Sequence, residues 1–269
     1  MDLQQIGAGH SAIKHVRDIQ NNTAPNRFKL LVADGLWEAN VVLDSGLRVD
    51  TVFVCWENIH SDEAHKRIGQ LVERAGRAYQ ISEKTLARIT ERGGRSDGIV
   101  VLAEMPHWDP DFIPLEDNAL VLVTDGMEIP GNLGTLLRTM DAVQADALVM
   151  TNRKTRMSHP KVLRASQGMS ARVPHLDFED TKDAIAWLKE HRFTVYLADT
   201  DESINYRQAD YSGRTAIVVG SEKYGIRKDY YDAGFKRIGI PMLGYADSLN
   251  AAVSASVFLY EARAQKAKW

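Results

Sequence analysis

The sequence predicts an α/β protein with mostly parallel sheets, divided into two units by a proline-containing linker. Extended, β-branched segments alternate with helical ones along nearly the whole chain, which is typical of parallel sheets with helices packed on them. Residues 106–118 interrupt this alternation, because they hold Pro106, Pro110 and Pro114 and show no apolar periodicity. We therefore expect a first unit at 1–105, a linker at 106–118 and a second unit at 119–269.

The first unit is expected to begin with a helix and to end with a strand. Helical periodicity and β-branched runs, separated by turn residues, mark its elements. In chain order we predict a helix at 11–20, strands at 28–33 and 49–54, a helix at 61–76, a short strand at 78–81, a helix at 82–91 and a strand at 98–104.

The second unit repeats the alternation with stronger strands. We predict strands at 119–124, 147–150, 194–198, 216–220 and 237–240, and helices at 133–143, 161–170, 181–190 and 248–265. The last helix places Leu249, Val253, Val257 and Tyr260 on one face. Small residues occupy much of its remaining surface and would let another backbone or a ligand come close: Ala251, Ala252, Ser254, Ala255 and Ser256.

Composition predicts a soluble protein with a sizeable core. The chain has 269 residues, of which 44% are hydrophobic and 26% charged. Its apolar runs are too short to cross a bilayer and its first residues lack the pattern of a signal peptide, so we expect a cytoplasmic location. The single cysteine, Cys55, cannot form an intramolecular disulfide, and the scattered histidines suggest no metal site.

The charge is distributed unevenly along the chain. A net charge of -3 gives no overall nucleic-acid signature. However, residues 147–176 contain no Asp or Glu, although they carry Arg153, Lys154, Arg156, Lys161, Arg164 and Arg172. Such a stretch can hold a polyanion, and a solvated charged surface is the alternative interpretation.

Three segments of the second unit place glycines and polar residues just after a predicted strand, where open α/β sheets usually bind ligands. The first, residues 125–139, contains Asn132 and Arg138. Its glycines lack the GxGxxG spacing of a dinucleotide site. Asn132 could simply cap the helix that follows, whereas the donor fork of Arg138 could clamp a phosphate or orient a ribose.

The other two segments are residues 217–225 and 240–250. In the former, Gly220 and Gly225 bracket a turn that exposes Glu222, and a tight turn with a surface acid is the alternative interpretation. In the latter, Ser248 has the residue type of an N-cap and Asn250 could merely start a helix.

Together the three segments resemble the SpoU/TrmH branch of the SPOUT methyltransferases. That family carries Asn-x-Gly-x-x-x-Arg, then Gly-Ser-Glu, then Ile-Pro-Met followed by Ser-Leu-Asn. The chain has them in the same order, at Asn132, Gly134 and Arg138, at Gly220, Ser221 and Glu222, at Ile240, Pro241 and Met242, and at Ser248, Leu249 and Asn250. The segment 163–168 is also similar to the family. Two departures from the pattern are Lys223 after Glu222 and Ala251 after Asn250.

The resemblance implies a methyltransferase that uses S-adenosylmethionine to methylate a ribose 2′-hydroxyl in rRNA or tRNA, without a metal. It implies a parallel sheet with helices on both faces, a deep trefoil knot and a homodimer whose interface completes the active site. The first unit resembles the L30e-like domain that precedes many of these catalytic domains and binds RNA substrate. The domain order and the Gly-Ser-Glu-Lys sequence at 220–223 are similar to those of the thiostrepton-resistance rRNA methyltransferases.

The resemblance also assigns residues to roles. The catalytic set is Arg138, Asn132, Glu222, Ser248 and Asn250. The cofactor-binding set is Gly220, Ser221, Ile240, Met242 and Leu249. With the basic stretch, we expect RNA contacts at Arg153, Lys154, Arg156, Arg164 and Ser166.

Two other functions are compatible with parts of the sequence. One is an RNA-binding relative that keeps the fold but lacks turnover, although every catalytic position of the motif is filled. The other is a nucleotide-dependent oxidoreductase on a doubly wound sheet, which the missing GxGxxG counts against.

Overall fold

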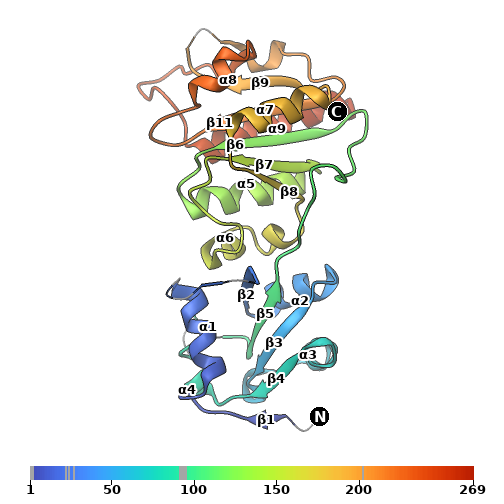
Figure 1. Cartoon of the computed structure of the whole chain (residues 1–269), viewed down its shortest axis with the longest axis vertical. Coiled ribbons are helices and arrows are strands. Elements are labelled where there is room, and N and C mark those ends of the chain that lie inside the picture. The colour runs from blue at the N-terminus through green and yellow to red at the C-terminus, as the bar shows by residue number, and fades with distance from the viewer. Residues whose placement is uncertain (1–2, 22, 24, 27, 91–95, 202) are drawn as a thin grey trace. The chain divides into compact units, whose positions relative to one another are not determined.

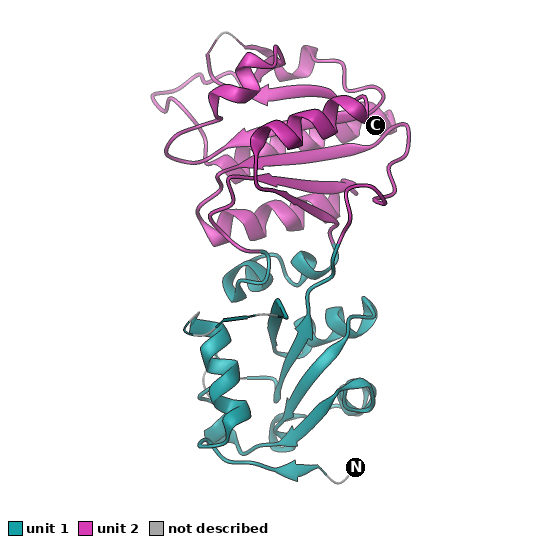
Figure 2. Ribbon diagram, in the orientation of Figure 1, with its two compact units in different colours: residues 1–107, 157–172 teal, residues 108–156, 173–269 magenta. Residues whose placement is uncertain are grey.

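The computed structural model describes residues 3–21, 23, 25–26, 28–90, 96–201 and 203–269. The chain forms two compact units (Figure 2). The first comprises Met1–His107 and Met157–Arg172, and the second comprises Trp108–Arg156 and Val173–Trp269. The segment Met157–Arg172 thus packs with the first unit, although the sequence placed it in the second, because its sequence position does not reveal its packing partner.

The first unit is built on a five-stranded sheet in the order β1-β4-β3-β5-β2 (Figure 1). β1, β4 and β3 run parallel, whereas β5 runs antiparallel to both β3 and β2. This sheet is therefore mixed, and the expectation of mostly parallel strands is wrong for it. The strands are β1 (Gln4–Gln5), β2 (Leu30–Asp34), β3 (Val49–Val54), β4 (Arg77–Gln80) and β5 (Ile99–Glu104).

Helices cover both faces of this sheet. On one face α1 (Ser11–Asn21) packs Ile13, Val16 and Ile19 against Phe53 and Leu102. The other face carries α2 (Leu36–Asp44) and α3 (Asp62–Arg74). The sequence did not predict α2, because five of its nine residues are buried and its apolar residues form a run rather than a helical period.

Two predicted helices of this unit are shorter in the structure. The helix expected at 82–91 is α4 (Glu83–Leu86) followed by turns, and Glu91 lies outside the described residues. The helix expected at 161–170 is α6 (Pro160–Ala165) followed by the 3-10 turn η3 (Met169–Ala171). Gly168 separates them at φ 87, and a Cβ there would lie 2.9 Å from Val41 Cγ2. Gln167, at φ 52, is the left-handed residue that ends α6, and Gly168 N donates to the Leu163 carbonyl at 2.8 Å.

The second unit has a seven-stranded sheet in the order β10-β12-β9-β11-β6-β7-β8, and all neighbouring strands run parallel. The predicted strands are present, and β8 and β10 were not predicted. Both unpredicted strands are short and lie at the edges of the sheet. The strands are β6 (Leu120–Asp125), β7 (Ala147–Thr151), β8 (His175–Phe178), β9 (Thr194–Ala198), β10 (Ile204–Asn205), β11 (Thr215–Gly220) and β12 (Lys236–Gly239).

Helices also cover both faces of the parallel sheet. Alternate residues of its central strands, such as Val121, Val123 and Val218, pack against α7 (Thr181–Glu190) and α8 (Lys228–Asp232). α5 (Pro130–Ala142) and α9 (Ala251–Ala267) pack together, and α9 contacts β11 and β6. No helix in the described part of the chain is long and apolar enough to cross a membrane.

The helix α9 buries three alanines together with Phe258 and Leu259, and it leaves other large apolar residues exposed. Its buried residues are Ala252, Ala255, Phe258, Leu259 and Ala262. By contrast, Leu249, Val253 and Tyr260 are 40%, 48% and 49% exposed. Small side chains let α9 approach α5 closely, and the hydrogen bond between Thr139 Oγ1 and Ser256 Oγ, 2.9 Å long, joins the two helices. Val253 and Tyr260 of α9 are left on the surface.

The turn after β11 folds back tightly on itself. Ser221 and Gly225 exchange backbone hydrogen bonds of 3.1 and 3.0 Å, and Tyr224 N donates to Ser221 Oγ at 3.0 Å. Gly225 has φ 66, in the left-handed region. A Cβ on Gly220 would lie 2.0 Å from the carbonyl carbon of Gly225, so only glycine fits where the returning chain crosses β11.

Replacing Gly220 by alanine is expected to destabilise the protein by about 2 kcal/mol, because the added methyl overlaps backbone that cannot move without opening the turn. Gly131, at the start of α5, is a matched control since a Cβ there meets nothing within 4 Å. Gly131→Ala should change the stability by less than about 1 kcal/mol. Urea unfolding measures both, and equal effects of the two substitutions would contradict the tight crossing.

Lys266 anchors the end of α9 by donating from Nζ to Asn118 Oδ1 at 3.1 Å and to the Gly213 carbonyl. Burial, and then the charge of Arg263, lower the pKa of Lys266 from 10.5 to about 8. Between these pH values the unfolded chain holds more protons than the folded one, so this residue makes the protein more stable as the pH rises from 8.

We expect Lys266→Met to remove that rise. Measured in urea from pH 7.5 upward, the unfolding free energy of the parent protein should rise above pH 8 relative to that of the variant, since only the parent carries a lysine that loses its proton earlier in the folded state. Parallel pH profiles would show that Lys266 titrates normally in the folded state.

Candidate active site

The loops that follow three strands of the parallel sheet surround a pocket of about 470 Å³. Ala198 and Asp199 come from the end of β9, Gly220 and Ser221 from the end of β11, and Ile240 follows β12. The carboxyl ends of parallel strands meet at one edge of a sheet, which explains why segments distant in sequence share this pocket. The beginning of α9 closes one side of it, with Ala251, Ser254 and Phe258.

The structure places every predicted cofactor-binding residue in this pocket: Gly220, Ser221, Ile240, Met242 and Leu249. Glu222, Ser248 and Asn250 of the predicted catalytic set line it as well. Apolar side chains therefore alternate in its wall with the polar atoms of strand ends, a composition typical of small-molecule sites.

Hydrogen bonds join the three sequence segments directly. Asn132 Nδ2 donates to Glu222 Oε1 at 2.6 Å, and Asn250 Nδ2 donates to Asn132 Oδ1 at 3.2 Å. The other carboxylate oxygen of Glu222 accepts from the backbone N–H of Glu128 at 3.4 Å. The three segments thus converge in space, and Asn132 connects the other two.

Two alternative interpretations of these asparagines are resolved. Asn132 does not cap α5, because that helix begins at Pro130 with Ile129 at the N-cap. Asn250 does cap α9, and its Oδ1 accepts from Ala252 N at 2.9 Å. Its Nδ2 remains available for Asn132, so a single side chain both starts the helix and belongs to the site.

Ser248 is not the N-cap that its residue type suggested. It is exposed in the loop before α9, and its hydroxyl donates to Asp247 Oδ1 at 3.0 Å. The cap lies two residues later, at Asn250, so Ser248 faces the pocket instead.

Two predicted catalytic residues, Asn132 and Arg138, do not line the pocket, and of these only Asn132 is hydrogen-bonded to residues that do. Arg138 lies on the exposed side of α5, and no described residue forms an ion pair or hydrogen bond with it. Six residues separate it from Asn132, which places the two side chains roughly 120° apart around the helix axis. A straight helix cannot direct both into the same pocket.

Sequence reasoning missed the contribution of the loop after β9. Asp199, Thr200 and Tyr231 line the pocket. Tyr231 donates to Asp199 Oδ2 at 2.7 Å, and burial followed by this hydrogen bond raises the pKa of Tyr231 to about 12. The rule that located the other segments, polar residues directly after a strand, also fits Asp199 and Thr200.

A buried carboxylate holds the sheet edge beside the pocket. Asp125, at the end of β6, is 1% exposed and accepts from Thr151 Oγ1 at 3.1 Å, from Asn152 Nδ2 at 2.5 Å and from Arg227 N at 2.7 Å. These bonds tie β6 and β7 to the chain that leaves the turn after β11. Thr151 also contacts the hydroxyl of Tyr230, whose pKa is raised by burial.

The predicted RNA-binding residues fall into two groups, of which the first lies in the second unit after β7. Lys154 is exposed, whereas Arg153 pairs with Asp177 at 3.0 Å. Asp177 lies just beyond the acid-free stretch, so this stretch is partly neutralised by a neighbouring strand. Arg156 is half-buried, and burial lowers its pKa.

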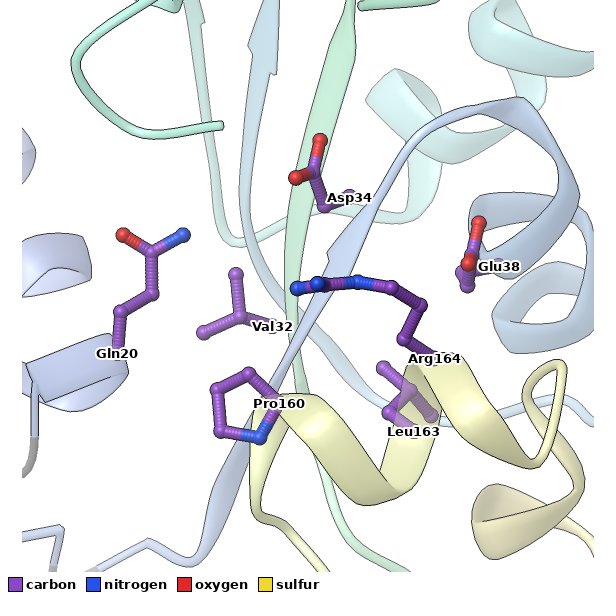
Figure 3. Close-up of a pocket in the computed structure, with 7 residues that line it drawn as sticks. All are labelled: Gln20, Val32, Asp34, Glu38, Pro160, Leu163 and Arg164. Atoms are coloured by element: carbon purple, nitrogen blue, oxygen red, sulfur yellow. The ribbon is translucent and has the colours of Figure 1, made fainter. Parts of the chain in front are cut away.

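The second group belongs to α6 and needs correction. Ser166 is fully buried, donates to the Leu163 carbonyl at 2.9 Å and accepts from Ser170 N at 3.1 Å, so its hydroxyl shapes the end of α6 rather than meeting RNA. Arg164 lies beside two carboxylates, those of Asp34 and Glu38 (Figure 3). Its charge is partly compensated within the first unit.

The pocket has the chemistry of a site for a small cationic ligand with an apolar portion. Asp199 and Glu222 supply carboxylates, and Ile240, Met242 and Leu249 supply apolar contacts. Among the residues described, no group of three or more His, Cys, Asp or Glu side chains is arranged to hold a metal ion.

Known proteins match this chain over the same region. The sequence model of the SpoU rRNA methylase family matches residues 119–260, which include all three converging segments. A protein of Staphylococcus haemolyticus that carries the name of a TrmH family tRNA/rRNA methyltransferase is 37% identical over 146 residues. This alignment covers 54% of the present chain and 59% of that relative.

Solved structures match both in fold and in extent. An AdoMet-bound rRNA methyltransferase from Sinorhizobium meliloti is 25% identical, with a TM-score of 0.85 over 94% of each chain. A structure described as an RNA 2′-O ribose methyltransferase is 28% identical, with a TM-score of 0.82 over 98% of this chain and 100% of that one. Because the family's sequence model covers more than half of the chain, this protein belongs to the SpoU rRNA methylase family.

Proposed function

We propose that this protein transfers a methyl group from S-adenosylmethionine to a ribose 2′-hydroxyl in structured rRNA or tRNA. The observation that carries the proposal is the convergence of Asn132, Glu222 and Asn250 at one pocket, through hydrogen bonds of 2.6 and 3.2 Å. Membership of the family supports methyl transfer to RNA. The 2′-O ribose methyltransferase among the similar structures supports the ribose as the acceptor.

The pocket fits S-adenosylmethionine. Gly220 brings backbone to the pocket wall without a side chain, and Ile240, Met242 and Leu249 offer apolar contacts for a purine ring. The carboxylates of Asp199 and Glu222 give the pocket a negative potential that favours a sulfonium cation. When bound, the cofactor supplies a methyl group whose transfer to an oxygen nucleophile requires no metal.

The residues of the site position the reacting groups. Once bound, S-adenosylmethionine would supply its methyl group to the 2′-oxygen, and the proton of that hydroxyl would leave to a water molecule or a neighbouring phosphate. Glu222 and Asn250, which line the pocket, hold the amide of Asn132 between them. Arg138 orients the ribose and its phosphate, since a guanidinium is a strong donor and a poor base.

A homodimer would reconcile this role with the position of Arg138. The exposed side of α5 carries Arg138, the helix α9 packed on it exposes Val253 and Tyr260, and Leu249 is exposed in the loop before α9. Such an apolar patch is typical of protein interfaces. We propose that a second copy covers it and that Arg138 of each copy serves the pocket of the other.

The remaining parts of the proposal concern the fold and the RNA. The proposal includes a deep trefoil knot in the second unit, where β11 lies between β9 and β6 and β12 lies between β10 and β9. The mixed α/β sheet of the first unit supports an L30e-like, RNA-binding role for it. Lys154 and its basic neighbours are proposed to contact RNA phosphates. We further propose that the enzyme is cytoplasmic and similar to the thiostrepton-resistance group.

Replacing Arg138 by alanine is expected to leave the affinity for S-adenosylmethionine unchanged, because the residue lies outside the pocket of its own chain. Methyl transfer should fall by at least about a thousandfold, through the loss of ribose alignment. Calorimetry measures the affinity, and tritiated-methyl incorporation into total RNA measures the turnover. Thr135→Ala, on the exposed side of the same helix, is the control. Unchanged turnover would remove Arg138 from the mechanism.

A mixture of two inactive variants tests whether Arg138 acts across the dimer. Met242→Arg places a cation in the pocket and should abolish cofactor binding. In a mixed dimer, the intact pocket of the Arg138→Ala subunit meets the intact arginine of the Met242→Arg subunit. Co-refolding equal amounts should therefore restore about a quarter of the parent activity. If the mixture stays inactive although mass spectrometry shows mixed dimers, each arginine serves its own chain.

A further inference from the structure

A second pocket, of about 260 Å³, lies in the first unit on the face of the sheet that α1 covers. Its floor is formed by the buried side chains of Phe53 and Leu102, and its rim by Ser11, His15 and Arg77. It exists because α1 covers only part of this face, and the first turn of the helix leaves the region over β3 and β4 open. Neither the family's sequence match, which begins at residue 119, nor the proposed active site reaches this pocket.

The walls of the pocket are held in place by neighbouring contacts. Tyr79 stacks on Phe53 with a ring-centroid distance of 5.8 Å, and His10 packs on Tyr79 at 5.3 Å. Arg77 Nη2 donates to Asp50 Oδ2 at 2.9 Å, which fixes the plane of its guanidinium at the rim. The pocket is therefore preformed and needs no rearrangement to receive a flat ring.

Polar groups around this apolar floor match the edges of a nucleobase. The Ser11 hydroxyl, the His15 imidazole and the Tyr79 hydroxyl can each donate or accept a hydrogen bond. Arg77 adds a planar cation, on which bases stack readily. A few convergent polar groups around an apolar floor are the composition expected of a site that orients one ring.

The charge beside the pocket matches a phosphate backbone. Along α1 the exposed side chains next to Ser11 and His15 include the cations Lys14 and Arg17. The acid on this helix, Asp18, is half-buried and accepts a hydrogen bond from Thr23 Oγ1 at 3.0 Å. Asp50 is committed to Arg77. A strand of RNA lying along α1 would therefore meet the positive charges of Lys14 and Arg17 beside the pocket.

We propose that this pocket binds an unstacked nucleobase of the RNA substrate, and so serves as a recognition site separate from the methyl-transfer pocket. The inference rests on the proposed function for the identity of RNA as the ligand. It assigns to α1, β3 and β4 the selection of a single-stranded or bulged nucleotide, which is how proteins usually read RNA sequence.

The test uses the full chain and total RNA. Ser11→Trp fills the pocket without changing the charge, and it should weaken RNA binding and raise the KM for RNA about tenfold, with unchanged kcat and unchanged affinity for S-adenosylmethionine. His60→Trp, at an exposed position of the same unit outside the pocket, is the matched control. Thermal melting checks that both variants fold.

A second pair of variants keeps the test independent of the tryptophan. Arg77→Ala removes the cation at the rim, and Arg48→Ala removes an arginine that is likewise paired with a carboxylate, at 3.3 Å from Glu104, outside the pocket. Only the former should weaken RNA binding. RNA transcribed with 4-thiouridine, photocrosslinked to the full chain, should attach to peptides containing His15, Arg77 or Tyr79.

The outcomes separate this site from the proposed function. Pocket crosslinks without any methyl transfer would leave the recognition site standing and overturn the enzymatic proposal. Methyl transfer with parent-like RNA affinity in both Ser11→Trp and Arg77→Ala would overturn the recognition site alone. Crosslinks that map only outside the first unit would also overturn it.

Discussion

The site depends on how closely the chain after β11 returns to its own strand. Gly220 leaves no room for a side chain beneath Gly225, and the reciprocal hydrogen bonds between Ser221 and Gly225 hold the returning chain in place. This packing makes the turn rigid, so Glu222 projects from a fixed point. Asn132 donates a hydrogen bond of 2.6 Å to the Glu222 carboxylate, and Asn250 in turn donates to the Asn132 side chain. A looser turn would leave three unrelated loops at the sheet edge.

Much of the second unit could be predicted from sequence because its signals are local. β-branched runs mark its central strands, and polar residues directly after strands mark the pocket, since parallel strands end together. The edge strands and the loop after β9 were missed, although Asp199 and Thr200 obey the same rule. The first unit was harder to predict. Its helix α2 has no clear helical period, and the antiparallel pairing of β5 with β2 and β3 depends on tertiary packing that no single segment encodes.

Other errors arose where one residue type serves two physical roles. Asn132 has the residue type of an N-cap, yet helix α5 starts at Pro130. The side-chain amide of Asn132 is therefore available to Glu222. Ser166 looked like a surface contact in a basic stretch, yet its hydroxyl closes the end of α6 through Leu163 and Ser170. Sequence gives the chemistry of such side chains, whereas only packing decides which partner uses it.

The helix α9 shows why the position of Arg138 is informative. A helix buries the side that fits its neighbours, and α9 packs on α5 and the sheet through alanines, Phe258 and Leu259, which leaves Val253 and Tyr260 in contact with water. Exposing the apolar side chains of Val253 and Tyr260 to water does not stabilise a single chain. The same packing holds Arg138 away from the pocket of its own chain. A second copy on this surface would bury the exposed apolar residues of α9 and would give Arg138 a pocket to act on.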